Sequence, residues 1–406
     1  MGVENNIPEG WIETSIGKVT VVESGGTPST KNPSYWGDEI PWITPRDLSS
    51  FKDMFIEKGE RSISIKGLEN SSAKLLPKNT ILFSSRAPIG YVVIAQNEIT
   101  TNQGFKNIIC DEANSHFKYF YYLMQYKADF IERLSSGSTF SEASGTLIKS
   151  IEINLPPLTE QKAIAKVLTA FDDKIELLQA QNNTLETMAQ TIFKEWFGKY
   201  QIGDELPEGW RVGKIEDLTE KMQSGGTPST KNKAYYTGDI SWFSTKELKD
   251  NFLLSSIKHI NKDAVKNSST KLFPRNSVLM AIYAAPTVGR LGILNHASCF
   301  NQAAVALVPN SNVQYAYLYL LLKYHRKDLN NLANGAAQQN LNVGLVKAFK
   351  TKIPHEKLLS LFNKKVIPIF EKIRHNAESI QSLTKTRDTL LPKLMSGQVR
   401  VNGFKK

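Results

Sequence analysis

Ser24–Asn32 reads SGGTPSTKN, and the same nine letters recur without change at residues 224–232. A long identity at a fixed spacing indicates an internal repeat, which decides the fold before any local structure is assigned. Other matching segments lie 197 to 200 residues apart: PEGW at 8–11 and 207–210, KLLPKNTILF at 74–83 and KLFPRNSVLM at 271–280, and YFYYL at 119–123 and YLYLL at 317–321. The chain is therefore a duplicated unit and not a short solenoid repeat.

Each copy begins with short β-type runs separated by Gly, Pro, Asn and Ser. One aromatic-rich segment interrupts these runs, near 116–134 in the first copy and near 313–332 in the second. Its tyrosines are expected to belong to the core rather than to form stacking platforms. We predict two similar globular α+β domains, at residues 1–157 and 200–354.

A different period follows each domain, over residues 158–199 and 355–406. Apolar residues alternate there at spacings of three and four, which is the heptad pattern of paired helices, and Asn182 and Asn376 stand in mid-seam where a buried polar residue can set register. Pro368 and Pro392 are expected to kink or break the second helix. The seam positions are Ile164, Leu168, Phe171, Ile175, Leu178, Asn182, Leu185, Ile192 and Trp196, and Phe362, Val366, Ile369, Ile373, Asn376, Ile380, Leu383, Leu390 and Leu394.

Each helix can pack on the core of its own domain or along the other helix, and two matched heptad stretches in one chain favour pairing. A helix over 159–197 is ~58 Å long at ~1.5 Å per residue. An antiparallel pair would separate the domains as a coiled-coil spacer and relate them by a pseudo-two-fold axis. Such a spacer suits a DNA target with two unlike halves, because positions on one face of DNA repeat every ~34 Å.

The charge is +11, from 50 basic and 39 acidic side chains, and it is unevenly placed. Residues 1–157 sum to −3, whereas residues 200–354 sum to +8. The excess indicates a polyanionic partner. Two cysteines, Cys110 and Cys299, do not make a disulfide framework, and no apolar run approaches ~20 residues. We expect a cytoplasmic protein without a membrane segment.

A search for catalytic motifs finds none that is convincing. A Walker loop, zinc-type Cys/His spacing and HExxH are all missing from the sequence. The segment Asn32-Pro33-Ser34-Tyr35 faintly resembles the NPPY element of amino-methyltransferases, but the second copy reads Asn232-Lys233-Ala234-Tyr235. Asp239, Glu247 and Lys249 resemble a nuclease triad that the first copy lacks. We predict no catalytic residue, no metal site and no bound cofactor in this chain.

Several motifs resemble those of the specificity subunits of type I restriction–modification systems, over essentially the whole chain. They are LPPLTEQKAIAKVL at 155–168, QTIFKEWF at 190–197, LLPKLMSGQVRV at 390–401, SSRAPIG at 84–90, TTNQGF at 100–105 and the repeated SGGTPST. The second copy departs from the pattern, with IPHEKLLSLF at 353–362 and IYAAPTVG at 282–289.

The resemblance implies that each domain is a target-recognition domain, which reads one half of a bipartite, asymmetric site in double-stranded DNA. It implies that the helices dock two methyltransferase subunits, which bring S-adenosylmethionine, and that restriction subunits using ATP join them. A free-standing DNA-binding regulator and a protein-binding scaffold remain as alternatives.

Candidate DNA-contacting residues lie in polar loops. Arg46 and Arg86 suit bidentate contacts with guanine, and their counterparts Lys246 and Tyr283 differ, as base-reading positions should. The glycine loops can present N–H groups to phosphate or form a tight turn that the fold requires, and the Asn-Gln pairs can contact adenine edges or cap a turn. The remaining candidates are Gly25, Gly26, Thr27, Thr101, Asn102, Gln103, Ser138, Thr139, Gly225, Gly226, Thr227, Asn301, Gln302, Gln338 and Gln339.

Overall fold

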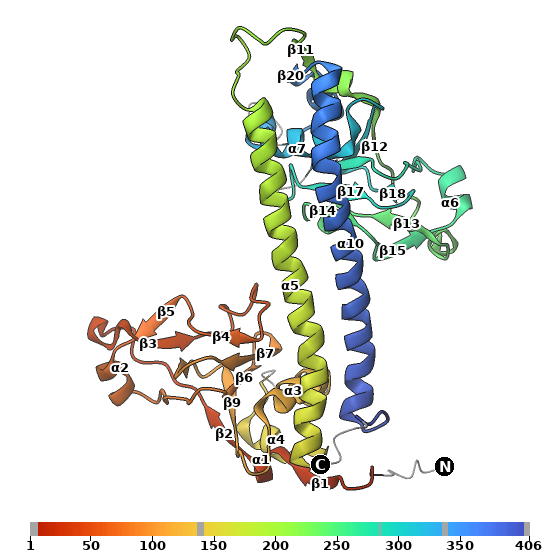
Figure 1. Ribbon diagram of the computed structural model, residues 1–406. Coiled ribbons are helices and arrows are strands. Elements are labelled where there is room, and N and C mark those ends of the chain that lie inside the picture. The colour runs from red at the N-terminus through yellow and green to blue at the C-terminus, as the bar shows by residue number, and fades with distance from the viewer. Residues whose placement is uncertain (1–6, 136–141, 284–285, 335–339, 402–406) are drawn as a thin grey trace. The chain divides into compact units, whose positions relative to one another are not determined.

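The structure is a computed structural model that describes residues 7–135, 142–283, 286–334 and 340–401 (Figure 1). The chain divides into two compact units. Unit 1 is Met1–Lys174 with Leu383–Lys406, and unit 2 is Ile175–Ser382. Each unit therefore contains one globular domain and a part of both long helices.

Unit 1 is built on three sheets. The first is five-stranded, in the order β2 (Thr20–Ser24), β9 (Phe105–Cys110), β6 (Ile81–Ser85), β7 (Ile89–Ala95), β4 (Phe55–Ile56). The second is three-stranded, in the order β5 (Arg61–Ile63), β3 (Trp36–Ile43), β8 (Thr100–Thr101), and the third pairs β1 (Ile12–Ser15) with β10 (Glu152–Leu155). The helical elements are α1 (Ile16–Val19), η1 (Pro33–Tyr35), α2 (Ile65–Glu69), α3 (Phe117–Ser135), α4 (Gly145–Ser150) and the start of α5 (Leu158–Phe197).

Unit 2 repeats this topology. Its five-stranded sheet has the order β12 (Thr219–Ser224), β19 (Ala304–Pro309), β16 (Val278–Ala281), β17 (Leu291–Leu294), β14 (Asn251–Leu253). Its smaller sheets are β15 (Lys258–Ile260), β13 (Ile240–Phe243), β18 (Cys299–Phe300), and β11 (Arg211–Lys214) with β20 (Lys350–Ile353). Its helical elements are η2 (Ile215–Leu218), η3 (Lys233–Tyr236), η4 (Thr245–Glu247), α6 (Lys262–Lys266), α7 (Gln314–Tyr324), α8 (Arg326–Asn334), α9 (Val343–Ala348) and α10 (Glu356–Met395). The predicted duplication and the α+β class are confirmed.

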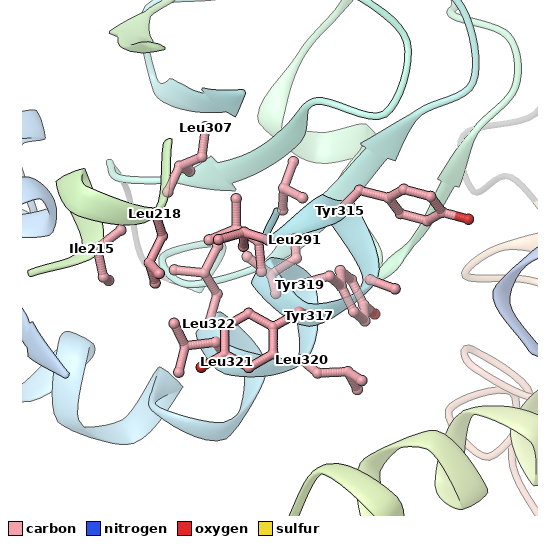
Figure 2. Close-up of a cluster of buried hydrophobic side chains, with 14 of the residues drawn as sticks. Ile215, Leu218, Leu291, Leu307, Tyr315, Tyr317, Tyr319, Leu320, Leu321 and Leu322 are labelled. Carbon is pink, nitrogen blue, oxygen red and sulfur yellow. The ribbon is translucent and has the colours of Figure 1, made fainter. Parts of the chain in front are cut away.

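The aromatic-rich helix forms the centre of each core. In unit 1 Tyr119 and Tyr122 of α3 are buried, and in unit 2 Tyr315, Tyr317 and Tyr319 lie among leucines of the sheet and of α7 (Figure 2). The expectation is confirmed for these tyrosines, whereas Tyr126 and Tyr324, which were covered by the same prediction, are 38% and 39% exposed. The second copy differs in one respect, because His325 ends α7 and a separate helix, α8, follows.

Within each unit the two long helices run antiparallel. In unit 2 Asn376 Nδ2 donates to Asn182 Oδ1 at 2.9 Å, and the rings of Phe197 and Phe362 lie 4.9 Å apart. From Asn182 to Phe197 the residue number rises along α5, while that of the contacting residue in α10 falls from Asn376 to Phe362. The two helices therefore run in opposite directions. In unit 1 Arg387 Nη1 donates to Asp172 Oδ1 at 2.5 Å, and Arg400 Nε donates to Glu160 Oε1 at 2.6 Å, with the same order.

The long helices pack on a globular domain as well as along each other. Phe193 and Phe197, one position beyond Ile192 and Trp196, are buried in the core of unit 2. Among the seam positions predicted from the heptads, the buried ones are Ile164, Leu168, Ile175, Leu178, Phe362, Val366, Asn376 and Leu394. The half-buried ones are Phe171, Asn182, Leu185, Ile192, Trp196, Ile369, Ile373, Ile380, Leu383 and Leu390.

Pro368 and Pro392 were expected to kink or break the second helix, and a break is wrong, because α10 continues through both prolines. A proline inside a helix costs ~3 kcal/mol or more. Val366 and Phe370, on either side of Pro368, are buried in the core of unit 2. Burial of such side chains contributes ~1.5–3 kcal/mol each, which is enough to keep the helix whole.

Candidate nucleic-acid interface

In unit 1 the candidate loops meet at one edge of the three-stranded sheet. Strands β3 and β8 are parallel, with Trp42 opposite Thr100, so the chain leaves both strands at the same edge. The N–H of Asn102 donates to the carbonyl of Ile43 at 2.9 Å, and the N–H of Ser85 donates to the carbonyl of Gly104 at 2.7 Å. The loops that carry Arg46, Gln103 and Arg86 are therefore joined by main-chain hydrogen bonds.

The glycine loop closes onto this group. The N–H of Gly26 donates to the carbonyl of Thr101 at 2.9 Å, and Thr27 Oγ1 donates to Gln103 Oε1. The indole N–H of Trp42 donates to the carbonyl of Gly26 at 2.9 Å. We call residues 25–27, 44–47, 85–88 and 101–104 the tip of unit 1.

Unit 2 has an equivalent tip. The N–H of Gly226 donates to the carbonyl of Phe300 at 2.9 Å, and Trp242 Nε1 donates to the carbonyl of Gly226 at 2.9 Å. Thr227 Oγ1 donates to Gln302 Oε1 at 2.5 Å. The N–H of Asn301 donates to the carbonyl of Phe243, and Tyr283 is anchored through its N–H to the carbonyl of Ala303.

The glycines shape the tips. A β-carbon on Gly26 would lie 2.3–2.4 Å from main-chain atoms of Ser72 and Ala73, and one on Gly25 would lie 2.0 Å from the carbonyl oxygen of Asn102. Gly225 and Gly226 are equally confined, with nearest atoms at 2.2 and 2.5 Å. Because the N–H groups of Gly26 and Gly226 are used inside the fold, these contacts support the turn-forming alternative for the glycines.

Of the amide side chains in each tip, the glutamine faces solvent. Thr101 is buried and its Oγ1 accepts from Asn107 Nδ2 at 2.8 Å, while Asn102 Oδ1 accepts from the N–H of Gly104 at 2.9 Å. Gln103 and its counterpart Gln302 are exposed, whereas Asn301, like Asn102, is half-buried. The glutamines are therefore the amide side chains of these loops that are open to a ligand.

Arg46 and Lys246 are exposed, each on a corner held by the next residue. Asp47 accepts from the N–H and Oγ1 of Thr44, both at 2.7 Å, and from the N–H of Glu60 at 2.8 Å. Glu247 accepts in the same way from Ser244, at 2.7 and 2.8 Å, and from Ile257 at 2.9 Å. These two carboxylates were missed as site residues, although the capping pattern in TPRD and STKE signals them.

Arg86 stands beside an acidic partner. Its Nη1 lies 3.8 Å from Glu142 Oε2, and the buried Lys106 lies 3.1 Å from the other oxygen of Glu142. The side chain of Arg86 remains 39% exposed, which leaves its guanidinium open to a ligand. Tyr283, its approximate counterpart in unit 2, is also exposed.

Four other candidates, Ser138, Thr139, Gln338 and Gln339, lie outside the described residues. In the part of the chain that is described, no group of three His, Cys, Asp or Glu side chains is placed to hold a metal ion. No described helix has the length and apolar character that crossing a membrane requires.

Substitution of Asp47 with alanine is expected to release the corner that presents Arg46. Loss of these three hydrogen bonds frees the corner, and without it Arg46 should lose its base contact, worth ~1–3 kcal/mol. We therefore expect DNA binding to weaken about tenfold, as measured by fluorescence anisotropy. Asp53→Ala removes an exposed carboxylate from the same unit and controls for the change in charge. If both variants bind alike, Asp47 has no positioning role.

The comparisons with known proteins agree with this organisation. The family model described as type I restriction modification DNA specificity domain matches residues 8–187 and again 207–381. The MjaIX specificity subunit of Methanocaldococcus jannaschii is 35% identical, over 97% of this chain and 95% of its own length. The HindI specificity subunit of Haemophilus influenzae is 24% identical, over 83% of this chain and 90% of its own.

A solved structure has the same fold. The crystal structure of the type I restriction–modification S subunit from M. genitalium matches with a TM-score of 0.62 and 18% identity, and the match covers 97% of this chain and 98% of that one. Together with the two copies of the family domain and the relative at 35% identity, the shared fold leads to one assignment. The chain belongs to the family of type I restriction–modification specificity subunits, which are non-catalytic components of their complexes.

Proposed function

We propose that each unit reads one half of a bipartite, asymmetric site in double-stranded DNA, and that the tips make the base contacts. One observation carries the proposal: the tips share their scaffold and differ at two exposed positions, although both also expose a glutamine, Gln103 and Gln302. Trp42 and Trp242 make the same hydrogen bond, whereas Arg46 is replaced by Lys246 and Arg86 by Tyr283. The shared scaffold holds the exposed side chains in place, and side chains of these types discriminate among base edges.

The rest of the chain serves assembly in this proposal. Residues 1–157 and 200–354 are the recognition domains, and residues 158–199 and 355–406 are the helical regions, which dock two methyltransferase subunits. Those subunits supply S-adenosylmethionine, and restriction subunits supply the ATP-dependent activity, in the cytoplasm. Because residues 1–157 sum to −3, the first recognition domain relies on local cations such as Arg46 and Arg86, or on its partners, to attract DNA.

Methylome sequencing tests the proposal directly. Cells that express this chain with its neighbouring methyltransferase and restriction subunits should show methyladenine in a motif of two unlike parts separated by a gap of fixed length. A chain that binds a specific duplex tightly by itself and directs no methylation would instead be a free-standing regulator. A chain that binds no duplex at any salt concentration would be a protein scaffold.

Arg86→Ala is expected to weaken binding to the correct site by ~1–3 kcal/mol, the value of one bidentate contact with guanine. The loss should be confined to one base pair in the half read by unit 1, since the tip of unit 2 is untouched. Binding to a set of duplexes with single base-pair changes measures both effects. Lys18→Ala, which removes an exposed cation of α1, is the control, and equal binding by the two variants removes Arg86 from the site.

A further inference from the structure

Glu60 in unit 1 and Ile257 in unit 2 occupy equivalent positions beside the corners of Arg46 and Lys246. One side chain is charged and the other is apolar. In unit 1 the N–H of Glu60 donates to Asp47 Oδ1 at 2.8 Å, and in unit 2 the N–H of Ile257 donates to Glu247 Oε1 at 2.9 Å. Strand register confirms the equivalence, because the next residue pairs with Trp42 in one unit and with Trp242 in the other.

The residue that follows keeps the same role in both units. The guanidinium carbon of Arg61 lies 3.4 Å from the ring centre of Trp36 and 5.7 Å from that of Trp42. Lys258 Nζ lies 5.8 Å from the ring of Tyr236 and 5.9 Å from that of Trp242. A cation over an aromatic pair stabilises both sites. The residues on both sides of this position, the corner carboxylate that accepts its N–H and the cation that follows it, make the same contacts in both units. Only the residue at the position itself, Glu60 or Ile257, differs.

Ile257 is unusually exposed. Its exposed fraction is 83%, the highest of any large apolar side chain among the described residues. Its main chain is nonetheless fixed, since Ser256 Oγ accepts from the N–H of Trp242 at 3.1 Å and donates to the carbonyl of Lys258 at 2.6 Å. Exposure of an apolar side chain to water does not stabilise the protein, whereas covering it with a ligand gives a favourable free energy of burial.

The surroundings of Ile257 indicate which ligand covers it. Ile257 forms part of the wall of a pocket of about 550 Å³ together with Lys233, Lys258, Tyr236 and His259. The positive charges of Lys233 and Lys258, in the same pocket wall as one exposed apolar side chain, complement a phosphate backbone next to an apolar base group. The C5-methyl of thymine is the apolar group that DNA presents in its major groove.

We infer that Ile257 and Glu60 are specificity-determining positions, one in each unit. Ile257 contacts the methyl group of a thymine in the half-site of unit 2. Glu60, which is also exposed, accepts a hydrogen bond from the N4 amine of a cytosine in the half-site of unit 1. This inference rests on the proposed function, and it identifies the chemistry that each position reads.

The test uses the full chain assembled with its methyltransferase subunits and duplexes that carry the motif found by methylome sequencing. Each thymine in the half assigned to unit 2 is replaced in turn by deoxyuridine, which lacks only the methyl group. The wild-type complex should bind one of these duplexes about three- to fivefold more weakly, the factor expected for one buried methyl. Ile257→Ala should bind that duplex and its thymine parent equally, and Val212→Ala, which truncates another exposed side chain of unit 2, should keep the preference.

For the other unit, Glu60→Gln should relax the requirement for one C·G pair and leave the second half-site unchanged. The inference is overturned if Ile257→Ala keeps the preference for thymine, if no uracil duplex binds more weakly, or if the half-site of unit 2 contains no A·T pair. It is also overturned if Ile257→Ala impairs only assembly with the methyltransferase subunits, which indicates a protein contact. In all these cases the motif itself is still bound, whereas failure of the proposed function removes selectivity for the motif altogether.

Discussion

Replacement of Phe362 with alanine is expected to lower the free energy of unfolding of unit 2 by ~3–5 kcal/mol. The side chain of Phe362 is fully buried. Its ring centre lies 4.9 Å from that of Phe197, 5.8 Å from Trp196 and 5.9 Å from Tyr317. The substitution therefore removes contacts with α5, with α7 and with the domain core at once, and it leaves a cavity that rigid aromatic neighbours cannot fill.

Leu361→Ala provides the matched control, because Leu361 is the preceding residue of α10 and is 57% exposed. Urea unfolding followed by peptide-resolved hydrogen exchange measures the two units separately. In Phe362→Ala the peptides of unit 2 should lose protection at lower urea, while those of unit 1 and of the control variant should not. Equal stability of the two variants would show that the aromatic cluster does not hold α10 to its domain.

Gly26→Ala is expected to destabilise unit 1 by ~2–3 kcal/mol, at the upper end of the cost of overpacking. The new β-carbon would lie 2.3–2.4 Å from main-chain atoms of Ser72 and Ala73, which cannot move as a flexible side chain does. Relief requires the glycine loop to shift, and that shift breaks the hydrogen bonds of Gly26 with Thr101 and Trp42. Binding to the half-site of unit 1 should therefore weaken together with stability.

Gly145→Ala is the control for Gly26→Ala, since a β-carbon on Gly145 meets nothing within 4 Å. Thermal unfolding of the three proteins compares their stabilities, and base-substituted duplexes compare their recognition. An unchanged melting temperature for Gly26→Ala would contradict the close packing described for the tip.

The features predicted correctly from sequence are those with a long periodic signal. The repeat of SGGTPSTKN implied two domains of one topology, and the heptads implied that the two helices pair, as the contacts Asn182–Asn376 and Asp172–Arg387 show within their units. The tyrosines of α3 and α7 were expected in the core, and Tyr119, Tyr122, Tyr315, Tyr317 and Tyr319 are buried there.

Features that depend on tertiary packing could not be predicted in this way. The heptad count selected Ile192 and Trp196, but the C-terminal part of α5 also packs on the globular domain of unit 2, and that second face buries Phe193 and Phe197. The rule that proline breaks a helix considers only the local backbone. It does not include the free energy of burying the side chains beside Pro368, which keeps α10 continuous.

The candidate site shows the same division. Arg46 and Lys246 were selected because they differ between the copies, but the carboxylates that hold them required a closer search for capping patterns. The equivalence of Glu60 and Ile257 requires strand register, since the two lie 197 residues apart in segments with little similarity in sequence.

The central claim is that the two units read the two halves of one DNA site independently. The most direct measurement is the methylome of cells in which residues 200–354 of this chain have been replaced by residues 1–157, with the helices left in place. We predict that both halves of the methylated motif then carry the same bases, those of the half that unit 1 reads in the wild type. A chimera that still methylates the wild-type motif, with two unlike halves, would contradict the claim.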